Sequence, residues 1–291
     1  MLTTVMIVAA AVQAPAQHAP ALVTTEWLAA NLRTPGLVLF HIGDPRSRAT
    51  YDAGHIPGAQ FLNPFVDLSA PPVEGGLRLE LPSAEHFDSV LEARGISDDS
   101  RVVLYTSDKY FTPASRAFFA LEYAGLRGRV SMLDGGLEAW KGEARTVTAD
   151  LPAPPRGSFT PRLQKQMVVD ADFLKTRLDD PGLALIDARD TSFYRGAETR
   201  QGRNGHIPGA RNLPFNTVML DDGKFKDPAA LGAMLANAGA TTGRTVVTYC
   251  HIGQQASLVW FTARMAGFDA KIYDGSFQDW ARRTELPVVS P

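Results

Sequence analysis

The 291-residue chain contains one cysteine, and the residues around it suit a reactive thiol. Cys250 directly follows the apolar run 245–249 and precedes the loop His251-Ile252-Gly253-Gln254-Gln255-Ala256. A loop that curls around a sulfur turns its backbone N–H groups inward, and the positive end of a following helix also favours an anion there. Gly253 permits the positive φ that such a turn needs. The sequence therefore predicts a nucleophilic thiolate with a lowered pKa at Cys250, and a binding cradle in residues 251–256.

The sequence predicts alternative roles for the side chains of this loop, because neighbouring residues in a cradle tend to project outward. His251 has three predicted roles: proton transfer to or from the thiol, electrostatic contact with the substrate, or simple exposure to solvent. At a normal pKa it is mostly neutral above pH 7. Gln254 and Gln255 are expected to contribute mainly through their backbone amides.

The segments on either side of the cysteine predict the elements that position it. Residues 183–186 and 245–249 are short apolar runs, typical of strands buried on both faces of a parallel sheet. Residues 257–265 are apolar nearly all round, which suits a helix packed on that sheet. Such alternation predicts right-handed crossovers and an α/β domain whose site lies at the carboxyl ends of the strands.

The chain repeats itself once. Gly54-His55-Ile56-Pro57-Gly58-Ala59 recurs letter for letter at 205–210, and three further matches follow in the same order. They pair 102–106 with 246–250, 114–125 with 256–267, and 133–140 with 273–280, at offsets of 140 to 151 residues. Four ordered matches indicate two copies of one domain. Because the hexapeptide also occurs in the copy without a cysteine, His55 and His206 are predicted to be structural residues of a tight turn.

The repeats divide the chain into a domain at 21–142, a Pro-rich linker at 143–167 and a domain at 168–291. Thr106 stands where the second copy has Cys250, and the loop after it, residues 107–113, is two residues longer than its counterpart. The second copy is therefore predicted to be catalytic and the first to be silent.

These features together resemble the tandem-domain rhodanese-type sulfurtransferases, the thiosulfate and 3-mercaptopyruvate sulfurtransferase family. The resemblance rests on the repeated hexapeptide, the strand that ends in Cys250, its loop, and Asp274-Gly275-Ser276 with Trp280, and it covers about residues 21 to 288. It implies two tandem rhodanese-like domains, each a mainly parallel α/β sheet flanked by helices. It also implies a persulfide on Cys250 that carries sulfane sulfur from donor to acceptor, without a cofactor.

The substrate is less well defined, because the loop departs from both branches of the family. Thiosulfate enzymes often follow the cysteine with Arg-Lys-Gly and mercaptopyruvate enzymes with Gly-Ser-Gly, whereas this chain has His-Ile-Gly. Phe193 stands where relatives carry an arginine, so Arg195, Arg200 and Arg203 are the candidates for binding an anionic donor. We expect thiosulfate to be the donor and a thiol or cyanide the acceptor. The alternatives are 3-mercaptopyruvate, or a non-enzymatic persulfide carrier or redox-sensing module.

Other functional classes lack their motifs. A formal net charge of −2 without long runs of one sign argues against nucleic-acid binding. Cysteine-dependent phosphatases need an arginine six residues after the cysteine, and Ala256 stands there. The glycine patterns of dinucleotide and ATP sites are absent from the sequence, and its six histidines are too scattered to predict a metal site.

The N-terminus resembles an export signal. Residues 2–16 are mostly small and apolar and end in Ala14-Pro15-Ala16, a small-x-small pattern. We therefore expect a signal peptide over residues 1–16 and a periplasmic or exported protein, with a cytoplasmic protein as the alternative. No segment is long and apolar enough to predict stable membrane insertion, and the sequence predicts no oligomeric state.

Overall fold

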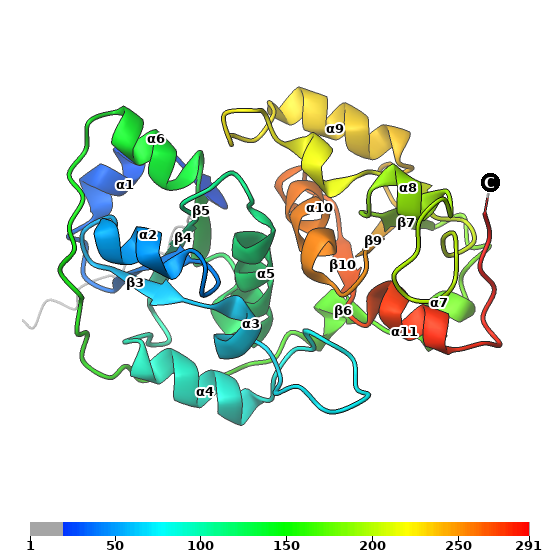
Figure 1. The fold of residues 1–291 in the computed structure, drawn as a ribbon, viewed down its shortest axis with the longest axis horizontal. Helices are drawn as coiled ribbons and strands as arrows, with labels where there is room; N and C mark the ends of the chain where they lie inside the picture. The colour runs from blue at the N-terminus through cyan, green and yellow to red at the C-terminus, as the bar shows by residue number, and fades with distance from the viewer. Residues whose placement is uncertain (1–19, 291) are drawn as a thin grey trace, which may run out of the picture.

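The computed structural model describes residues 20–290, which form two domains of the same topology (Figure 1). The strands of the first domain are β1 (Leu22–Val23), β2 (Leu37–Ile42), β3 (Ala59–Leu62), β4 (Arg101–Tyr105) and β5 (Val130–Leu133). Its helices are α1 (Thr25–Asn31), α2 (Arg48–Ala53), α3 (Pro64–Asp67), α4 (Ala84–Ala93), α5 (Thr112–Leu121) and α6 (Gly136–Gly142).

The second domain repeats this order of strands and helices, except that a 3-10 helix at Phe215–Val218 stands in the place of α3. Its strands are β6 (Val168–Val169), β7 (Leu183–Asp187), β8 (Arg211–Asn212), β9 (Thr245–Tyr249) and β10 (Ala270–Tyr273). Its helices are α7 (Ala171–Lys175), α8 (Thr191–Tyr194), α9 (Pro228–Asn237), α10 (Gln254–Met265) and α11 (Ser276–Arg282). The strand orders β1-β5-β4-β2-β3 and β6-β10-β9-β7-β8 are equivalent, and the paired strands are parallel. The predicted tandem α/β fold is confirmed.

Each sheet is covered by helices on both faces, because successive side chains of a strand point to opposite sides. In β2, Leu39 belongs to a cluster with residues of α1 and α6, whereas Phe40 and Ile42 belong to one with residues of α4 and α5. The second domain repeats this division, with α7 and α11 on one face and α9 and α10 on the other. Strands buried on both faces explain the short, continuously apolar runs of the sequence.

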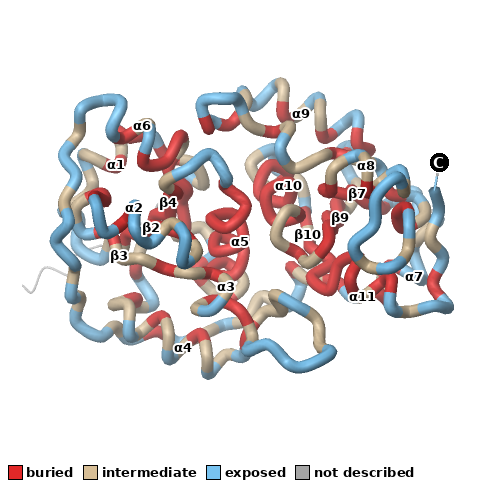
Figure 2. Tube along the Cα trace, in the orientation of Figure 1, coloured by how far each residue is buried: buried red, intermediate tan, exposed pale blue. Residues whose placement is uncertain are grey.

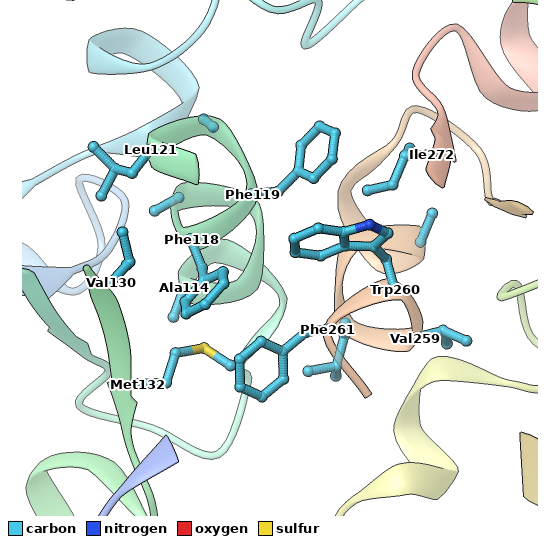
Figure 3. Packing of buried hydrophobic residues seen from close by; sticks show 14 of the residues in the cluster. Ala114, Phe118, Phe119, Leu121, Val130, Met132, Val259, Trp260, Phe261 and Ile272 are labelled. Atoms are coloured by element: carbon cyan, nitrogen blue, oxygen red, sulfur yellow. The ribbon is translucent and has the colours of Figure 1, made fainter. Parts of the chain in front are cut away.

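The two domains join through equivalent helices, so that their inner cores form one continuous cluster. Helices α5 and α10 lie side by side at the centre of the molecule and are buried over most of their length (Figures 1 and 2). Figure 3 shows Phe118 and Phe119 facing Trp260 and Phe261 across this contact. Ring centroids lie 4.9 Å apart for both Phe118–Phe261 and Phe119–Trp260. Aromatic pairs at this spacing add stability beyond the area that they bury.

A buried ion pair also joins the domains. Arg116 of α5 lies 2.5 Å from Asp274, which follows β10, and the two side chains are 0% and 7% exposed. Arg116 also donates a hydrogen bond to the carbonyl of Leu79, and the N–H of Leu81 donates to Asp274 at 3.2 Å. Asp274 therefore anchors the N-terminal domain to the C-terminal domain.

The Pro-rich stretch between the domains lies along the N-terminal domain. Gly157 N donates to Glu92 O, Arg162 N to Ala124 O, and Gln164 N to Tyr123 O, each at 2.8 Å. Within residues 20–290, none of the helices is long and apolar enough to cross a membrane. The signal peptide expected at 1–16 lies outside the described residues.

We predict that Arg116→Met greatly destabilises the protein, by about 3–5 kcal/mol, because it leaves the Asp274 carboxylate buried without its partner. The matched control is Arg46→Met, which removes the Arg46–Asp44 pair, whose arginine side chain is 92% exposed. Urea unfolding of both variants measures the difference. Equal midpoints for the two variants would contradict the importance of the buried pair.

Candidate active site around Cys250

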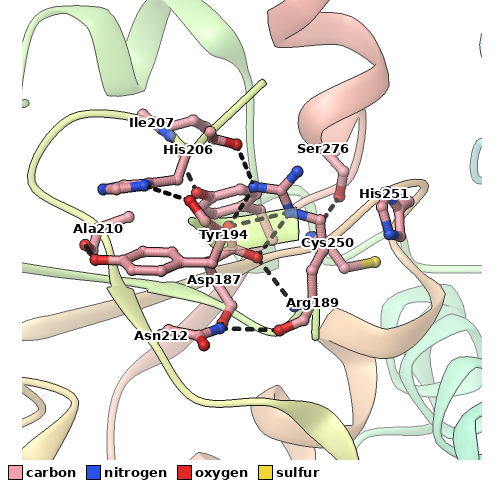
Figure 4. A network of polar contacts seen from close by, with 12 residues as sticks. Asp187, Arg189, Tyr194, His206, Ile207, Ala210, Asn212, Cys250, His251 and Ser276 are labelled. Carbon is pink, nitrogen blue, oxygen red and sulfur yellow. Dashed lines mark hydrogen bonds and ion pairs between the residues drawn. The ribbon is translucent and has the colours of Figure 1, made fainter. Parts of the chain in front are cut away.

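Cys250 lies between β9 and α10, at the carboxyl end of the strand, where the sequence places it (Figure 4). Gly253 turns the chain into the helix with φ of 84°. A Cβ at this glycine would lie 3.1 Å from Asp274 O and 3.2 Å from a guanidinium nitrogen of Arg116. A side chain at position 253 would therefore be both strained and crowded by the domain-joining ion pair.

The loop forms the predicted cradle of amides around the sulfur. Burial raises the pKa of the Cys250 thiol above its usual value. The backbone N–H groups of Ile252, Gly253, Gln255 and Ala256 favour the thiolate and lower the pKa, but by less than burial raises it. The predicted lowering of the pKa of Cys250 is thus wrong, because its side chain is 0% exposed and must ionise away from water.

The first residues of α11 bind the backbone of Cys250. Ser276 Oγ accepts a hydrogen bond from Cys250 N at 3.2 Å, and Phe277 N donates to Cys250 O at 2.9 Å. Ser276 has φ of 52°, in the left-handed region that non-glycine residues rarely adopt. The Asp274-Gly275-Ser276 turn therefore fixes the backbone of the cysteine.

A second buried ion pair lies beside the cysteine. Arg189 Nη2 is 2.6 Å from Asp187 Oδ2, with side chains 2% and 0% exposed, and also donates to Gly205 O at 2.8 Å (Figure 4). The Arg189 guanidinium also lies 4.1 Å from the centre of the Phe277 ring. Arg189 is not among the site residues predicted from the sequence, although its position two residues after the end of β7 could have indicated it.

His251 is buried rather than exposed. Its side chain is 5% exposed, its Nδ1 lies 3.1 Å from Gln201 Oε1, and its ring meets the edge of Phe193 with centroids 4.6 Å apart. Burial, helped by the positive charges of Arg189 and Arg200, lowers the pKa of His251 to about 3. The imidazole is therefore neutral near pH 7, and of the three roles predicted for His251, simple exposure to solvent is wrong.

A cavity of about 310 Å³ opens above His251 and Ile252, and we call it the mouth. Its lining residues are Arg78, Arg200, Gln201, His251, Ile252, Gln278 and Arg282. No Asp or Glu is among these described lining residues, so the mouth has a positive charge.

The structure brings only one of the three candidate arginines to the mouth. Arg200 lines it, with its guanidinium 5.0 Å from the centre of the Phe193 ring. Arg203 instead donates to the carbonyls of Arg283 and Leu286, at 3.2 and 2.8 Å, so its role is structural. Arg195 ends α8 as an exposed residue outside the mouth. Of the three candidates, Arg200 is the one that the structure places at the mouth, and its binding of a donor stays a prediction.

The remaining residues of the loop differ in their surroundings. Gln254 Nε2 donates to Thr112 Oγ1 of the N-terminal domain at 2.8 Å. Gln255 Oε1 is buried and has no hydrogen-bond partner within the described part of the chain. Ala256 is buried, and its carbonyl accepts a hydrogen bond from Thr248 at 3.0 Å. Ile252 lines the mouth. Ile252, Gln255 and Ala256 contribute to the cysteine through their backbone N–H groups, as expected for Gln255, whereas a backbone role of Gln254 stays a prediction.

The repeated histidines have structural contacts in both domains. His55 and His206 stack on Tyr51 and Tyr194 with centroids 3.9 and 3.8 Å apart, and each Nδ1 lies 2.8 Å from the carbonyl of the same tyrosine. At the position equivalent to Cys250, Thr106 donates from its hydroxyl to Asp108 O at 2.7 Å. The hydroxyl therefore closes its own loop.

Comparison with known families agrees with this geometry. The profile of the rhodanese-like domain matches residues 24–143 and 170–283. The chain belongs to the rhodanese family of sulfurtransferases. Its cysteine loop lies in the C-terminal domain, and a threonine stands at the equivalent position of the N-terminal domain.

Three relatives are similar over nearly the whole chain. The protein "Sulfur carrier protein TtuD" of Thermus thermophilus is 32% identical, over 94% of this chain and 97% of that protein. The "Probable 3-mercaptopyruvate sulfurtransferase" of Pseudomonas aeruginosa is 36% identical, over 92% and 98%. The "Thiosulfate sulfurtransferase" of Azotobacter vinelandii is 32% identical, over 90% and 94%. The crystal structure of SseA from Escherichia coli, described as a 3-mercaptopyruvate sulfotransferase, superposes with a TM-score of 0.77 at 26% identity, covering 89% of this chain and 99% of that one.

We predict that sulfur loading of Cys250 becomes faster with rising pH, by about tenfold per unit, because the thiolate fraction grows until the raised pKa of the thiol is reached. Titration of His251 should not change the slope of the loading rate against pH between pH 6 and 8, because its pKa of about 3 lies below that range. Intact-mass measurement of samples quenched after mixing with thiosulfate gives the rate. His251→Asn should show the same profile, and a break near pH 6.5 that this variant removes would contradict the prediction.

Proposed function

We propose that this sulfurtransferase takes sulfane sulfur from a small oxyanionic donor, with thiosulfate favoured, and passes it to a thiol or cyanide. The observation that carries the proposal is the single buried thiol, held in a cradle of amides, next to a mouth with three arginines and no carboxylate among its lining residues. Such a mouth attracts anions, and the cradle accommodates negative charge on sulfur.

The first step transfers one sulfur atom to the enzyme. The Cys250 thiolate attacks the outer sulfur of thiosulfate, a sulfur–sulfur bond forms, and the bond to the sulfonate sulfur breaks with its electron pair leaving on sulfite. The products are a Cys250 persulfide anion and the sulfite dianion, so charge and electrons balance without a cofactor. The cradle amides stabilise the charge of the persulfide.

The second step restores the cysteine. A thiolate or cyanide attacks the outer sulfur of the persulfide, and the Cys250 thiolate leaves.

The thiol proton must leave Cys250 before the first step. It passes to solvent, because His251, with a pKa of about 3, is too weak a base to hold it at neutral pH.

The choice of donor separates this proposal from its alternatives. Relatives of similar identity are named for thiosulfate and for 3-mercaptopyruvate, and one is named a sulfur carrier. Two guanidinium groups at the mouth, those of Arg78 and Arg200, have no ion pair within residues 20–290 and favour a dianion over a monoanion. Initial rates with thiosulfate and with 3-mercaptopyruvate, using cyanide as acceptor, test this preference. A larger kcat/KM for mercaptopyruvate would overturn it, and a single equivalent of sulfur without turnover would favour the carrier.

We expect Cys250→Ser to abolish sulfur transfer, because a serine hydroxyl neither ionises near neutral pH nor stores sulfane sulfur. After treatment with thiosulfate, intact-mass spectrometry should show one added sulfur on the wild-type protein and none on the variant. Circular dichroism provides the control for folding. Turnover retained by the serine variant would refute the mechanism.

We predict that Arg200→Ala raises the KM for thiosulfate by about tenfold with little change in kcat, because it removes a ground-state contact with the anion. Arg195→Ala is the matched control, since this arginine is exposed in the same segment but lies outside the mouth. Steady-state kinetics of both variants measure the effect. Equal KM values would show that Arg200 does not bind the donor.

A further inference from the structure

The segment between α3 and α4 extends from the N-terminal domain to the C-terminal domain. In Figure 1 it is the cyan loop that extends beneath β6 towards α11, and its tip is exposed in Figure 2. Residues 75–81 of this segment bind side chains of the catalytic domain. The segment therefore reaches the mouth from the domain that has no cysteine.

The backbone of this segment is held at several points. Gln278 of α11 both accepts from Arg78 N at 3.0 Å and donates to Arg78 O at 2.8 Å. Arg282 of the same helix donates to the carbonyls of Gly75 and Gly76 at 2.8 and 3.0 Å. On the other side, the buried Arg116 donates to Leu79 O. These contacts fix the backbone on both sides of Arg78 and use none of its side-chain donors.

The Arg78 guanidinium has no hydrogen bond or ion pair among residues 20–290, although it lines the mouth. Arg200, which lines the same cavity from the catalytic domain, contacts the face of Phe193 and likewise has no carboxylate partner within those residues. Arg46, elsewhere in the N-terminal domain, is by contrast paired with Asp44 at 2.6 Å. Two unneutralised guanidinium groups from two domains therefore face one cavity of about 310 Å³.

We propose that Arg78 of the silent domain binds the anionic substrate, so that the binding site is shared between the domains. The proposal rests on the proposed function, since the ligand is the oxyanionic sulfur donor. Guanidinium groups bind oxyanions through several fixed donors, and a backbone that is already fixed lowers the entropic cost of placing one. Arg78 and Arg200 would then contact the sulfonate oxygens, while the outer sulfur is directed towards Cys250.

Binding without turnover provides the direct test. In a Cys250→Ser background, titration calorimetry with thiosulfate should show about tenfold weaker binding after Arg78→Ala, because a charge-assisted contact is lost. Arg78→Lys should recover part of the affinity, since it retains the charge without the fork of donors. Arg33→Ala, which changes an exposed arginine elsewhere in the N-terminal domain, should leave binding unchanged.

The kinetics of the intact enzyme separate binding from a structural role. Arg78→Ala should raise the KM for thiosulfate by about tenfold, with kcat and the thermal midpoint close to wild type, because Gln278 holds only the backbone of residue 78. Unchanged affinity in the calorimetric experiment, or a KM that rises only together with a lower thermal midpoint, would overturn the proposal. Failure of the wild-type protein to acquire sulfur on Cys250 would instead overturn the proposed function, and calorimetry would still decide the role of Arg78.

Discussion

The contact between α5 and α10 is the interaction on which the rest of the structure depends. The two helices are equivalent elements of the repeat, and Ser115 Oγ lies 2.8 Å from Ser257 Oγ, which joins equivalent residues of the two copies. Around this point, aromatic rings from both helices pack into one core. Because α10 begins at Gln254, directly after the cysteine loop, whatever fixes this helix also fixes the cradle.

Burial and the amide cradle act in opposite directions on the cysteine. The fully buried sulfur loses contact with water, which disfavours its charge, while four backbone N–H groups favour it. The balance lies with the neutral thiol in the closed site. A cradle of amides is suited to a negative charge that arrives or develops during the reaction, because its dipoles are in place beforehand and need no reorganisation.

The domain without a cysteine is more than a remnant of duplication. Arg116 pairs with Asp274 beneath Gly253, Thr112 binds Gln254, and the segment around Arg78 covers the side of the mouth. The Arg116–Asp274 pair lies next to Gly253, and Thr112 binds the first residue of α10. Arg78 lines the same cavity as His251 and Ile252. The C-terminal domain thus carries the reactive cysteine, and the N-terminal domain positions the cysteine loop and lines part of the mouth.

The sequence by itself determined the fold class, the duplication and the chemical centre. Short apolar runs predicted the strands, the exact recurrence of a hexapeptide predicted two domains, and a lone cysteine between strand and helix predicted the cradle, because these are local patterns in the chain. The conformation of Gly253 was equally local, since a tight turn at that point leaves few alternatives to a positive φ.

Only the tertiary structure decided the charges and partners of the site. The burial of His251 and Cys250 depends on Phe193, Gln201 and α11, which lie 25 to 58 residues away along the chain. The direction of both pKa shifts therefore could not be predicted from neighbouring residues. Among Arg195, Arg200 and Arg203, spacing could not show which side chain faces the mouth, because an irregular loop has no period. No sequence pattern indicated Arg78 as a site residue, since it belongs to the other domain and reaches the mouth only when α5 and α10 pack together.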